Sequence, residues 1–229
     1  MIQFVLLDLD DTILDFHRAE AAAVSKTLSS FGIEPTERVV RRYSEINAAH
    51  WRMLERGEIT RPEVLTGRFR LLFSELSVVR DLEETQRIYE SHLSRGHYFI
   101  PDAEQLLKDL YGKYLLYIVS NGNAVVQEGR LKSAAIAPYF EDIFISELIG
   151  ADKPSEQFFD ACFSRIPDFD REQAILIGDS PTSDILGGIR AGVKTCWFNP
   201  KRRPPHPEIR ADYEIESLSE VPALLKQIG

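Results

Sequence analysis

The fold is decided by the stretch Phe4-Val5-Leu6-Leu7-Asp8-Leu9-Asp10-Asp11-Thr12-Ile13-Leu14, in which four consecutive apolar residues lead directly into carboxylates. A short, continuous apolar run is typical of a strand buried on both faces of a parallel sheet. Unpaired charge is costly inside a core, so Asp8 and Asp10 are expected at the tip of the strand. Ligands of open α/β sheets bind beyond the carboxyl ends of the strands. The stretch therefore indicates an active site, although taken alone it also fits a solvated turn with surface acids.

Three later apolar runs also end in polar residues that can carry chemistry. These runs, with the residues that follow them, are 114–119 with Ser120-Asn121-Gly122, 143–145 with Lys153-Pro154, and 174–177 with Gly178-Asp179-Ser180 and Asp184. An acidic pair, a hydroxyl, a lysine and a second acidic pair therefore each follow an expected strand, in that order. This joint pattern is much rarer by chance than any one of its parts.

The ordered set resembles the four sequence motifs of the haloacid dehalogenase (HAD) superfamily. Residues 8–12, Asp-Leu-Asp-Asp-Thr, are similar to its DxDx(T/V) motif. Ser120 and Lys153-Pro154 are similar to its second and third motifs, and residues 178–184 match its GDxxxxD motif. The resemblance covers nearly the whole chain. It implies a Rossmann-like α/β core, which is a doubly wound parallel sheet.

An insert between the first two expected strands is helical in character. The expected helices within residues 17–97 are 17–31, 36–56, 60–76 and 81–95. Thr60 and Glu63 have the spacing of a capping box at the start of the third helix. In the superfamily an insert at this place is a cap that closes over the active site. The resemblance thus implies a core domain of residues 1–15 and 98–229 and a helical cap domain of residues 16–97.

The rest of the chain alternates helices with strands, which favours a doubly wound parallel sheet. The expected helices are 102–111, 123–135, 155–165, 182–191 and 218–228, and the further strands are 194–198 and an edge strand at 213–215. A Pro-rich loop, 199–210, separates those last two strands. Its Lys201-Arg202-Arg203 cluster is interpreted as part of a solvated loop, in preference to an anion site.

The length, composition and net charge of the chain limit the classes of protein to which it can belong. The chain has 229 residues, of which 44% are hydrophobic and 28% charged, enough for one α/β domain with a smaller insert. The formal net charge of −9 argues against a nucleic-acid polymer as partner. Cys162 and Cys196 lie in apolar contexts and are expected to be buried free thiols. No signal peptide or membrane span is apparent, so a cytoplasmic protein without membrane partners is expected, as a monomer or homodimer.

The aspartates Asp8, Asp10, Asp179 and Asp184 are expected to converge on one pocket. Two like charges about 4 Å apart repel by about 4 kcal/mol at an effective dielectric of about 20, so the cluster needs a cation. Oxygen ligands with room for water suit Mg²⁺ better than Zn²⁺. By the resemblance, the Asp8 side chain, the Asp10 backbone carbonyl and Asp179 hold Mg²⁺. Thr12 and Asp184 are expected to support the site without binding the metal.

The resemblance implies phosphoryl transfer in two steps. Asp8 attacks phosphorus and forms an aspartyl-phosphate, and Asp10 protonates the leaving oxygen and then activates water. Ser120 and the backbone near Asn121 hold the transferring phosphoryl oxygens. Lys153 neutralises charge on Asp8 and on the substrate phosphate. The catalytic residues are thus expected to be Asp8, Asp10, Ser120 and Lys153.

Other reactions of the superfamily fit this sequence less well. Dehalogenase relatives lack an acid at the place of Asp10. Phosphonate-cleaving relatives need a Schiff-base lysine in the cap, where Lys26 is the only lysine and is interpreted as a surface residue. Hydrolysis of a small phosphomonoester is therefore favoured. A mutase acting on a sugar phosphate stays an alternative, because it uses the same pair of aspartates.

The expected substrate is a nucleoside monophosphate. Trp51, residues 57–60, residues 67–69 and residues 196–199 resemble the 5'-nucleotidase subfamily that hydrolyses nucleotides with standard and non-standard bases. Trp51 could stack on a base and Arg68 could meet a phosphate or ribose, so both are expected to bind substrate together with Ser120, Asn121 and Lys153. The alternative is that Trp51 and Phe69 pack in the cap core and that Arg68 is a surface or ion-pair residue. A sugar phosphate or another small phosphometabolite is the alternative substrate.

Two readings from other classes remain. A phospho-receiver module also places an acidic pair, a hydroxyl and a lysine around a parallel sheet. The length, the helical insert and the second acidic pair argue against a receiver. The chain could also have a catalytically competent fold but serve mainly as a binding partner of another protein. Turnover of p-nitrophenyl phosphate with and without Mg²⁺ separates these readings from a phosphatase.

Overall fold

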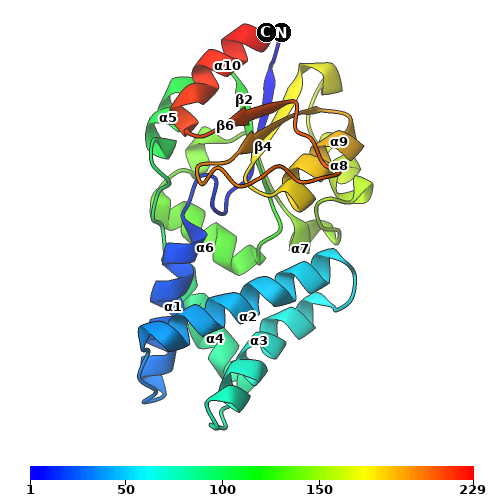
Figure 1. The fold of residues 1–229 in the computed structure, drawn as a ribbon. Helices are drawn as coiled ribbons and strands as arrows, with labels where there is room; N and C mark the ends of the chain where they lie inside the picture. Colours follow the sequence, from blue (N-terminus) through cyan, green and yellow to red (C-terminus); the bar gives the residue numbers. More distant parts are fainter. The chain divides into compact units, whose positions relative to one another are not determined.

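The computed structural model describes residues 1–229, which form two compact units (Figure 1). The α/β unit comprises residues 1–15, 99–124 and 134–229, and the helical unit comprises residues 16–98 and 125–133. The domain boundaries expected from the sequence stay a prediction. The two units divide differently at 125–133, because Val126 is buried in the core of the helical unit and the Arg130 Nε donates to the Gly96 carbonyl at 3.0 Å.

The α/β unit is built on a six-stranded sheet in the order β3-β2-β1-β4-β5-β6. The strands are β1 (Phe4–Leu7), β2 (Leu115–Ser120), β3 (Asp142–Ile145), β4 (Ala174–Gly178), β5 (Lys194–Phe198) and β6 (Tyr213–Ile215). Every pair of neighbours is parallel. The doubly wound parallel fold predicted from the sequence is therefore confirmed, with 213–215 at one edge.

Strand β1 lies in the middle of the sheet because its four apolar residues are completely or almost completely buried. Phe4 is paired with Leu115 on one side and Ala174 on the other, and Leu7 with Ile118 and Ile177. This register brings the carboxyl ends of β1, β2 and β4 to the same edge. The side chains that follow these strands therefore meet there.

Helices flank the sheet within the α/β unit. They are α5 (Ala103–Leu110), α7 (Ser146–Ile149), α8 (Glu156–Phe163), α9 (Leu186–Ala191) and α10 (Val221–Ile228). Only the two end residues of α6 (Ala124–Ala134) belong to this unit. Phe4 and Leu6 of β1 share one core cluster with Phe158 and Phe159 of α8. Gly187 of α9 allows a close approach, because a Cβ at this position would lie 2.6 Å from the Phe159 ring. Cys162 and Cys196 are buried free thiols, as the sequence predicts.

The helical unit contains α1 (Phe16–Ser30), α2 (Glu37–Glu55), α3 (Arg61–Glu75) and α4 (Leu82–Leu93). The four helices expected from the sequence are confirmed. The Thr60 N–H donates to the Glu63 carboxylate at 2.7 Å, in the predicted capping box. Tyr43, Phe69 and Tyr89 form the aromatic centre of this unit, with ring centroids 5.0 to 5.5 Å apart. None of the helices has both the length and the apolar character that crossing a bilayer requires.

Candidate active site

Asp8 continues directly from the central strand. Its N–H donates to the Ile177 carbonyl at 3.0 Å, which extends the ladder between β1 and β4 by one residue. The chain then turns tightly, and the N–H groups of Ile13 and Leu14 both donate to the Leu9 carbonyl at 3.0 and 2.9 Å. Asp11 lies in the left-handed region with φ 59°, which aspartate tolerates better than most residues. This turn places the half-buried Asp10 two residues beyond Asp8 at the rim of the sheet.

The Asp8 carboxylate is held from two sides. It is 6% exposed, and its two oxygens accept from the Lys153 ammonium at 2.7 Å and from the Thr12 hydroxyl at 3.1 Å. Thr12 is fully buried and lies four residues after Asp8 in the same turn. Fixing both oxygens selects one side-chain orientation, which is the kind of positioning a nucleophile needs.

Lys153 is completely engaged in this structure. Its ammonium donates to Asp8 Oδ1, to Asp184 Oδ1 and to the Val119 carbonyl, each at 2.7 Å. An ammonium has three hydrogens, so these three acceptors satisfy it. Burial alone lowers the pKa of Lys153, but the carboxylates of Asp184 and Asp8 raise it above its ordinary value. Lys153 is therefore a permanent cation whose hydrogens are already used inside the site.

The side chain of Asn121, next to Ser120, binds the main chain of Lys153. The Asn121 side chain accepts from the Lys153 N–H at 2.8 Å and donates to the Lys153 carbonyl at 2.9 Å. Ser120 ends β2 and is 1% exposed, and its hydroxyl accepts from the Gly122 N–H at 3.1 Å. Asn121 thus fixes the position of Lys153, while the phosphate-binding roles expected for Ser120 and Asn121 stay predictions.

The secondary structure of the segment after β4 differs from the prediction. A single helix over 182–191 was predicted, but the chain forms a π-helical turn, Pro181–Ile185, followed by α9. In this turn the N–H groups of Asp184 and Ile185 both donate to the Ser180 carbonyl. The Asp184 Oδ2 in turn accepts from the Ser180 N–H at 3.0 Å. π-Turns are frequent at functional sites, and here the turn directs Asp184 at Lys153.

Gly178 is required by the position of Asp184. A Cβ at Gly178 would collide with the Asp184 carboxylate. We expect Gly178→Ala to displace Asp184 from Lys153, to lower the rate of ester hydrolysis by at least about tenfold and to cost about 1 to 3 kcal/mol of stability. Steady-state kinetics and thermal unfolding measure both effects.

A double variant supplies the control for this prediction. In an Asp184→Gly background no side-chain atom of residue 184 is left to collide, so adding Gly178→Ala is expected to cause little further loss. Equal losses from Gly178→Ala in both backgrounds would contradict the steric explanation.

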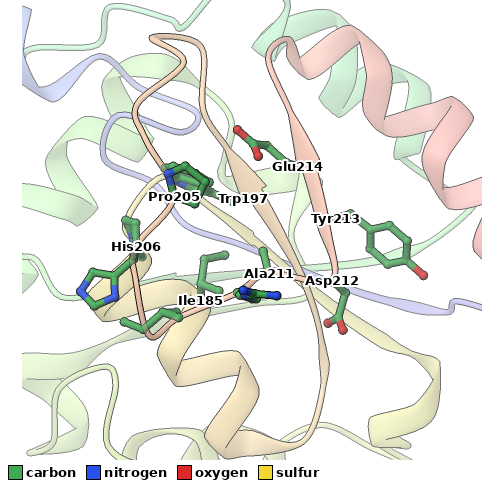
Figure 2. Close-up of a pocket in the computed structure, with 11 residues that line it drawn as sticks. Ile185, Trp197, Pro205, His206, Ala211, Asp212, Tyr213 and Glu214 are labelled. Atoms are coloured by element: carbon green, nitrogen blue, oxygen red, sulfur yellow. The ribbon is translucent and has the colours of Figure 1, made fainter.

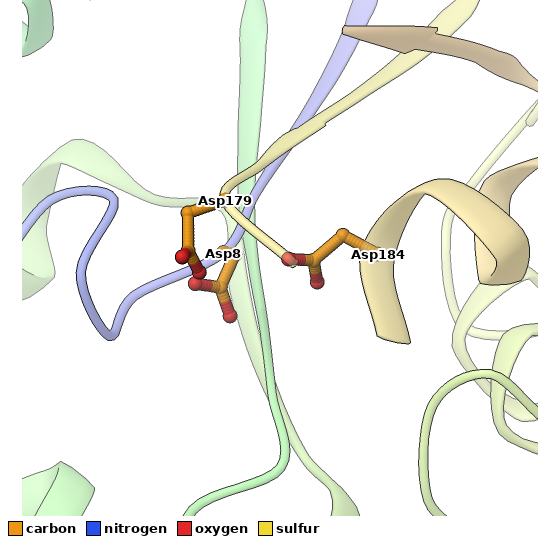
Figure 3. Close-up of side chains that lie close together, drawn as sticks. All are labelled: Asp8, Asp179 and Asp184. Atoms are coloured by element: carbon orange, nitrogen blue, oxygen red, sulfur yellow. The ribbon is translucent and has the colours of Figure 1, made fainter. Parts of the chain in front are cut away.

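Three carboxylates form a compact acidic cluster at this edge of the sheet (Figure 3). Asp8, Asp179 and Asp184 offer oxygens that all lie within 4.8 Å of one another. Burial raises the pKa of Asp8 well above its ordinary value, with Lys153 opposing and the neighbouring carboxylates adding to the effect. Burial also raises the pKa of Asp179 to about 7, and the charge of Asp184 adds to it. One lysine does not balance these charges, and a set of oxygen donors of this kind could hold a hard divalent cation.

Asp179 is contacted by two residues from the strand and loop next to it. The Trp197 indole N–H donates to the Asp179 carbonyl at 2.9 Å. An Arg203 Nη2 donates to the same carbonyl at 2.6 Å and lies 3.2 Å from the Asp179 Oδ2. Residues 201–203 are exposed, as expected for a solvated loop, but the contact of Arg203 with Asp179 was not predicted. The signal available was its place in the chain, since it follows β5 at the same sheet edge as Asp179.

A cavity of about 390 Å³ lies beneath the Pro-rich loop (Figure 2). Its walls come from the π-helical turn and α9 junction at Ile185, from Trp197 of β5, and from loop residues that include Pro205 and His206. The loop therefore packs over Trp197 and does not extend freely into solvent. Trp197 both lines this cavity and holds the Asp179 carbonyl.

Arg68 is buried within the helical unit. It is 3% exposed, and it donates to the Asn47 side chain at 2.7 Å and to the Gln86 side chain at 3.0 Å. Asn47 in turn donates to Glu20 at 2.6 Å. Burial raises the pKa of Glu20, opposed by the hydrogen bonds from Ser44 and Asn47. Arg68 therefore belongs to a buried network of polar side chains. Its role in substrate binding stays a prediction.

Trp51 lies on α2 and is half-buried in the helical unit. The Arg61 guanidinium lies 5.5 Å from the centroid of its ring, in a cation–π contact. The four catalytic candidates and the acidic cluster belong to the α/β unit, whereas Trp51 and Arg68 belong to the other. The predicted contact between Trp51 and a base therefore stays untested.

The sequence of the chain matches a known protein family, and its fold matches that of a solved structure. Residues 5–198 match the family model described as haloacid dehalogenase-like hydrolase. The HAD-hydrolase YfnB of Bacillus subtilis is 42% identical over 217 residues, covering 95% of this chain and 92% of YfnB. Its magnesium-bound crystal structure superimposes with a TM-score of 0.94 at 41% identity, covering 98% of each chain.

Two further relatives carry a substrate class in their names. The pyrimidine 5'-nucleotidase PynA of Streptococcus pneumoniae is 34% identical over 220 residues, covering 96% of this chain and 93% of PynA. The pyrimidine 5'-nucleotidase YjjG of Escherichia coli is 28% identical over 225 residues, covering 97% of each chain. These similarities span both units of the chain.

Proposed function

Because the chain belongs to the haloacid dehalogenase-like hydrolase family, and is a phosphatase within it, we propose that it is a Mg²⁺-dependent 5'-nucleotidase for pyrimidine nucleoside monophosphates. The observation that carries the phosphatase part is the buried Asp8 carboxylate, held by Lys153 and Thr12 at the rim of the central strand. The pyrimidine part is supported by the two nucleotidase relatives, which align over almost their whole length.

The first chemical step forms a bond between an Asp8 carboxylate oxygen and phosphorus. The ester P–O bond breaks as Asp10 gives its proton to the leaving nucleoside oxygen. Water then attacks phosphorus, Asp10 takes a proton from it, and the bond between phosphorus and Asp8 breaks to release phosphate. Ser120 holds phosphoryl oxygens, and Lys153 keeps Asp8 oriented and partly neutralised.

The acidic cluster is the place where a divalent cation fits. Asp8, Asp179 and the Asp10 carbonyl would hold it, and Asp184 would support them through Lys153. When bound, Mg²⁺ supplies the positive charge that allows a phosphate dianion to approach the carboxylates. Burial is the main reason that the pKa values of Asp8 and Asp179 are raised, and the neighbouring carboxylates raise them further. A divalent cation would offset both effects.

A substrate panel tests the proposal. UMP, CMP and dTMP are compared with AMP, GMP and several sugar phosphates at saturating Mg²⁺, and phosphate release is measured as kcat/KM. We expect the pyrimidine nucleotides to exceed the sugar phosphates by at least about tenfold, a difference of about 1.4 kcal/mol in transition-state binding.

Each outcome of the panel has a distinct meaning. Sugar phosphates that win by a similar factor would contradict the nucleotidase assignment but not the phosphatase. Purine nucleotides equal to pyrimidine nucleotides would contradict the base preference alone. No turnover of any ester, p-nitrophenyl phosphate included, would contradict the phosphatase.

A further inference from the structure

The main chain of Arg203 is held in place by the side chain of Asn199. The side chain of Asn199 is fully buried, and it accepts from the Arg203 N–H and donates to the Arg203 carbonyl, both at 2.9 Å. Asn199 also donates to Glu214 of β6 at 2.7 Å. Asn199 therefore ties the main chain at Arg203 to the sheet.

The guanidinium of Arg203 is directed at one residue of the acidic cluster. It reaches both the carbonyl and the Oδ2 of Asp179 and lies 5.6 Å from the centroid of the Trp197 ring. Trp197, which pairs with Gly178 across the sheet, holds the same carbonyl from its indole N–H. Asp179 is thus fixed at its main chain by two donors and at its side chain by one.

We propose that Arg203 is a positioning residue for the divalent cation. By binding the main chain and one carboxylate oxygen of Asp179, it holds that carboxylate toward Asp8 and Asp184. The inference builds on the proposed function, because it takes the acidic cluster as the metal site. Partners that orient a ligating carboxylate contribute strongly to metal affinity, and their loss typically weakens binding by about tenfold or more.

A simple charge argument predicts the opposite outcome. Arg203 carries a positive charge beside the cluster, so its removal would strengthen cation binding if only Coulomb repulsion mattered. Its side chain is 43% exposed, and solvent weakens that repulsion. The direction of the change in Mg²⁺ affinity therefore separates positioning from repulsion.

The test measures Mg²⁺ binding to the full chain without substrate, by isothermal titration calorimetry and by the Mg²⁺-dependent rise in Tm. The variants are Arg203→Ala and Arg203→Lys, with Arg202→Ala as matched control. Arg202 is the neighbouring loop arginine, whose charge pairs with Glu216 at 2.6 Å and not with Asp179. We expect both Arg203 variants to bind Mg²⁺ about tenfold more weakly. A single nitrogen, Nη2, makes both contacts with Asp179, and the lysine side chain is one bond too short to place its ammonium there. Arg202→Ala is expected to bind like the unaltered chain.

Kinetics supply a second readout. The loss of activity in Arg203→Ala is expected to be recovered at high Mg²⁺, with the KM for substrate unchanged. Unchanged or tighter Mg²⁺ binding in Arg203→Ala would overturn the inference, as would full rescue by Arg203→Lys. A wrong substrate class leaves the titration unaffected, whereas failure of the unaltered chain to bind Mg²⁺ would contradict the metal in the proposed function and this inference with it.

Discussion

Asp8→Asn is expected to reduce phosphate-ester hydrolysis by at least about a thousandfold while leaving the fold intact. The amide lacks the charge and basicity of the carboxylate nucleophile. It has nearly the same shape, and its oxygen can still accept from Lys153 while its nitrogen donates to the Thr12 hydroxyl. Removing one of three clustered negative charges also relieves repulsion, so the Tm is expected to stay the same or rise.

The measurement is the rate of phosphate release beside the Tm from calorimetry. Asp160→Asn is the matched control, because Asp160 is exposed and pairs with Arg171 on the surface at 3.1 Å. The control is expected to keep full activity. Residual activity of Asp8→Asn above about one per cent of the unaltered chain would exclude Asp8 as the nucleophile.

Lys153→Met is expected to have the largest effect on stability, together with loss of activity. Methionine fills much of the same volume but leaves Asp8, Asp184 and the Val119 carbonyl without their donor. Removing one partner of a buried ion pair costs about 3 to 5 kcal/mol, because the other charges stay buried and unpaired. For a chain of this length, a Tm lower by roughly 10 °C is expected.

Calorimetry of the metal-free protein measures this effect directly. Lys113→Met is the matched control, since the Lys113 ammonium is exposed and donates only to the Asp109 carbonyl at 2.7 Å. Its Tm is expected to change by no more than about 2 °C. A Lys153→Met protein that unfolds at the same temperature as the control would show that the ammonium does not stabilise the cluster.

The sheet was predictable because its strands carry a strong local signal. Each buried parallel strand reads as a short apolar run, and the polar residue that ends each run marks the edge where the ligand binds. Asp8, Ser120 and Asp179 could be placed at that edge without coordinates, whereas the order of the strands comes from the structure. The caps of the helices, such as Thr60 with Glu63, are equally local and were also found.

The parts that sequence reasoning missed depend on distant partners. A π-helical turn and an α-helical turn have the same composition, and the turn at 181–185 is set by the contacts of Asp184 with Ser180 and Lys153. Residues 125–133 are part of α6, and the sequence of this helix does not reveal which unit its buried side chains pack into. Arg203 was missed because a Pro-rich stretch with three cations has the composition of a solvated loop. Only the hydrogen bonds from the Asn199 side chain show that the main chain of Arg203 is fixed.

The three hydrogen bonds of Lys153 have a mechanical consequence. They tie the residue after β1, the end of β2 and the π-helical turn after β4 to a single nitrogen atom. Fraying at any one of these strand ends would leave one hydrogen of the buried ammonium without an acceptor, so we expect the three ends to lose order together. We therefore expect amide hydrogens at these three strand ends to exchange with solvent at similar rates.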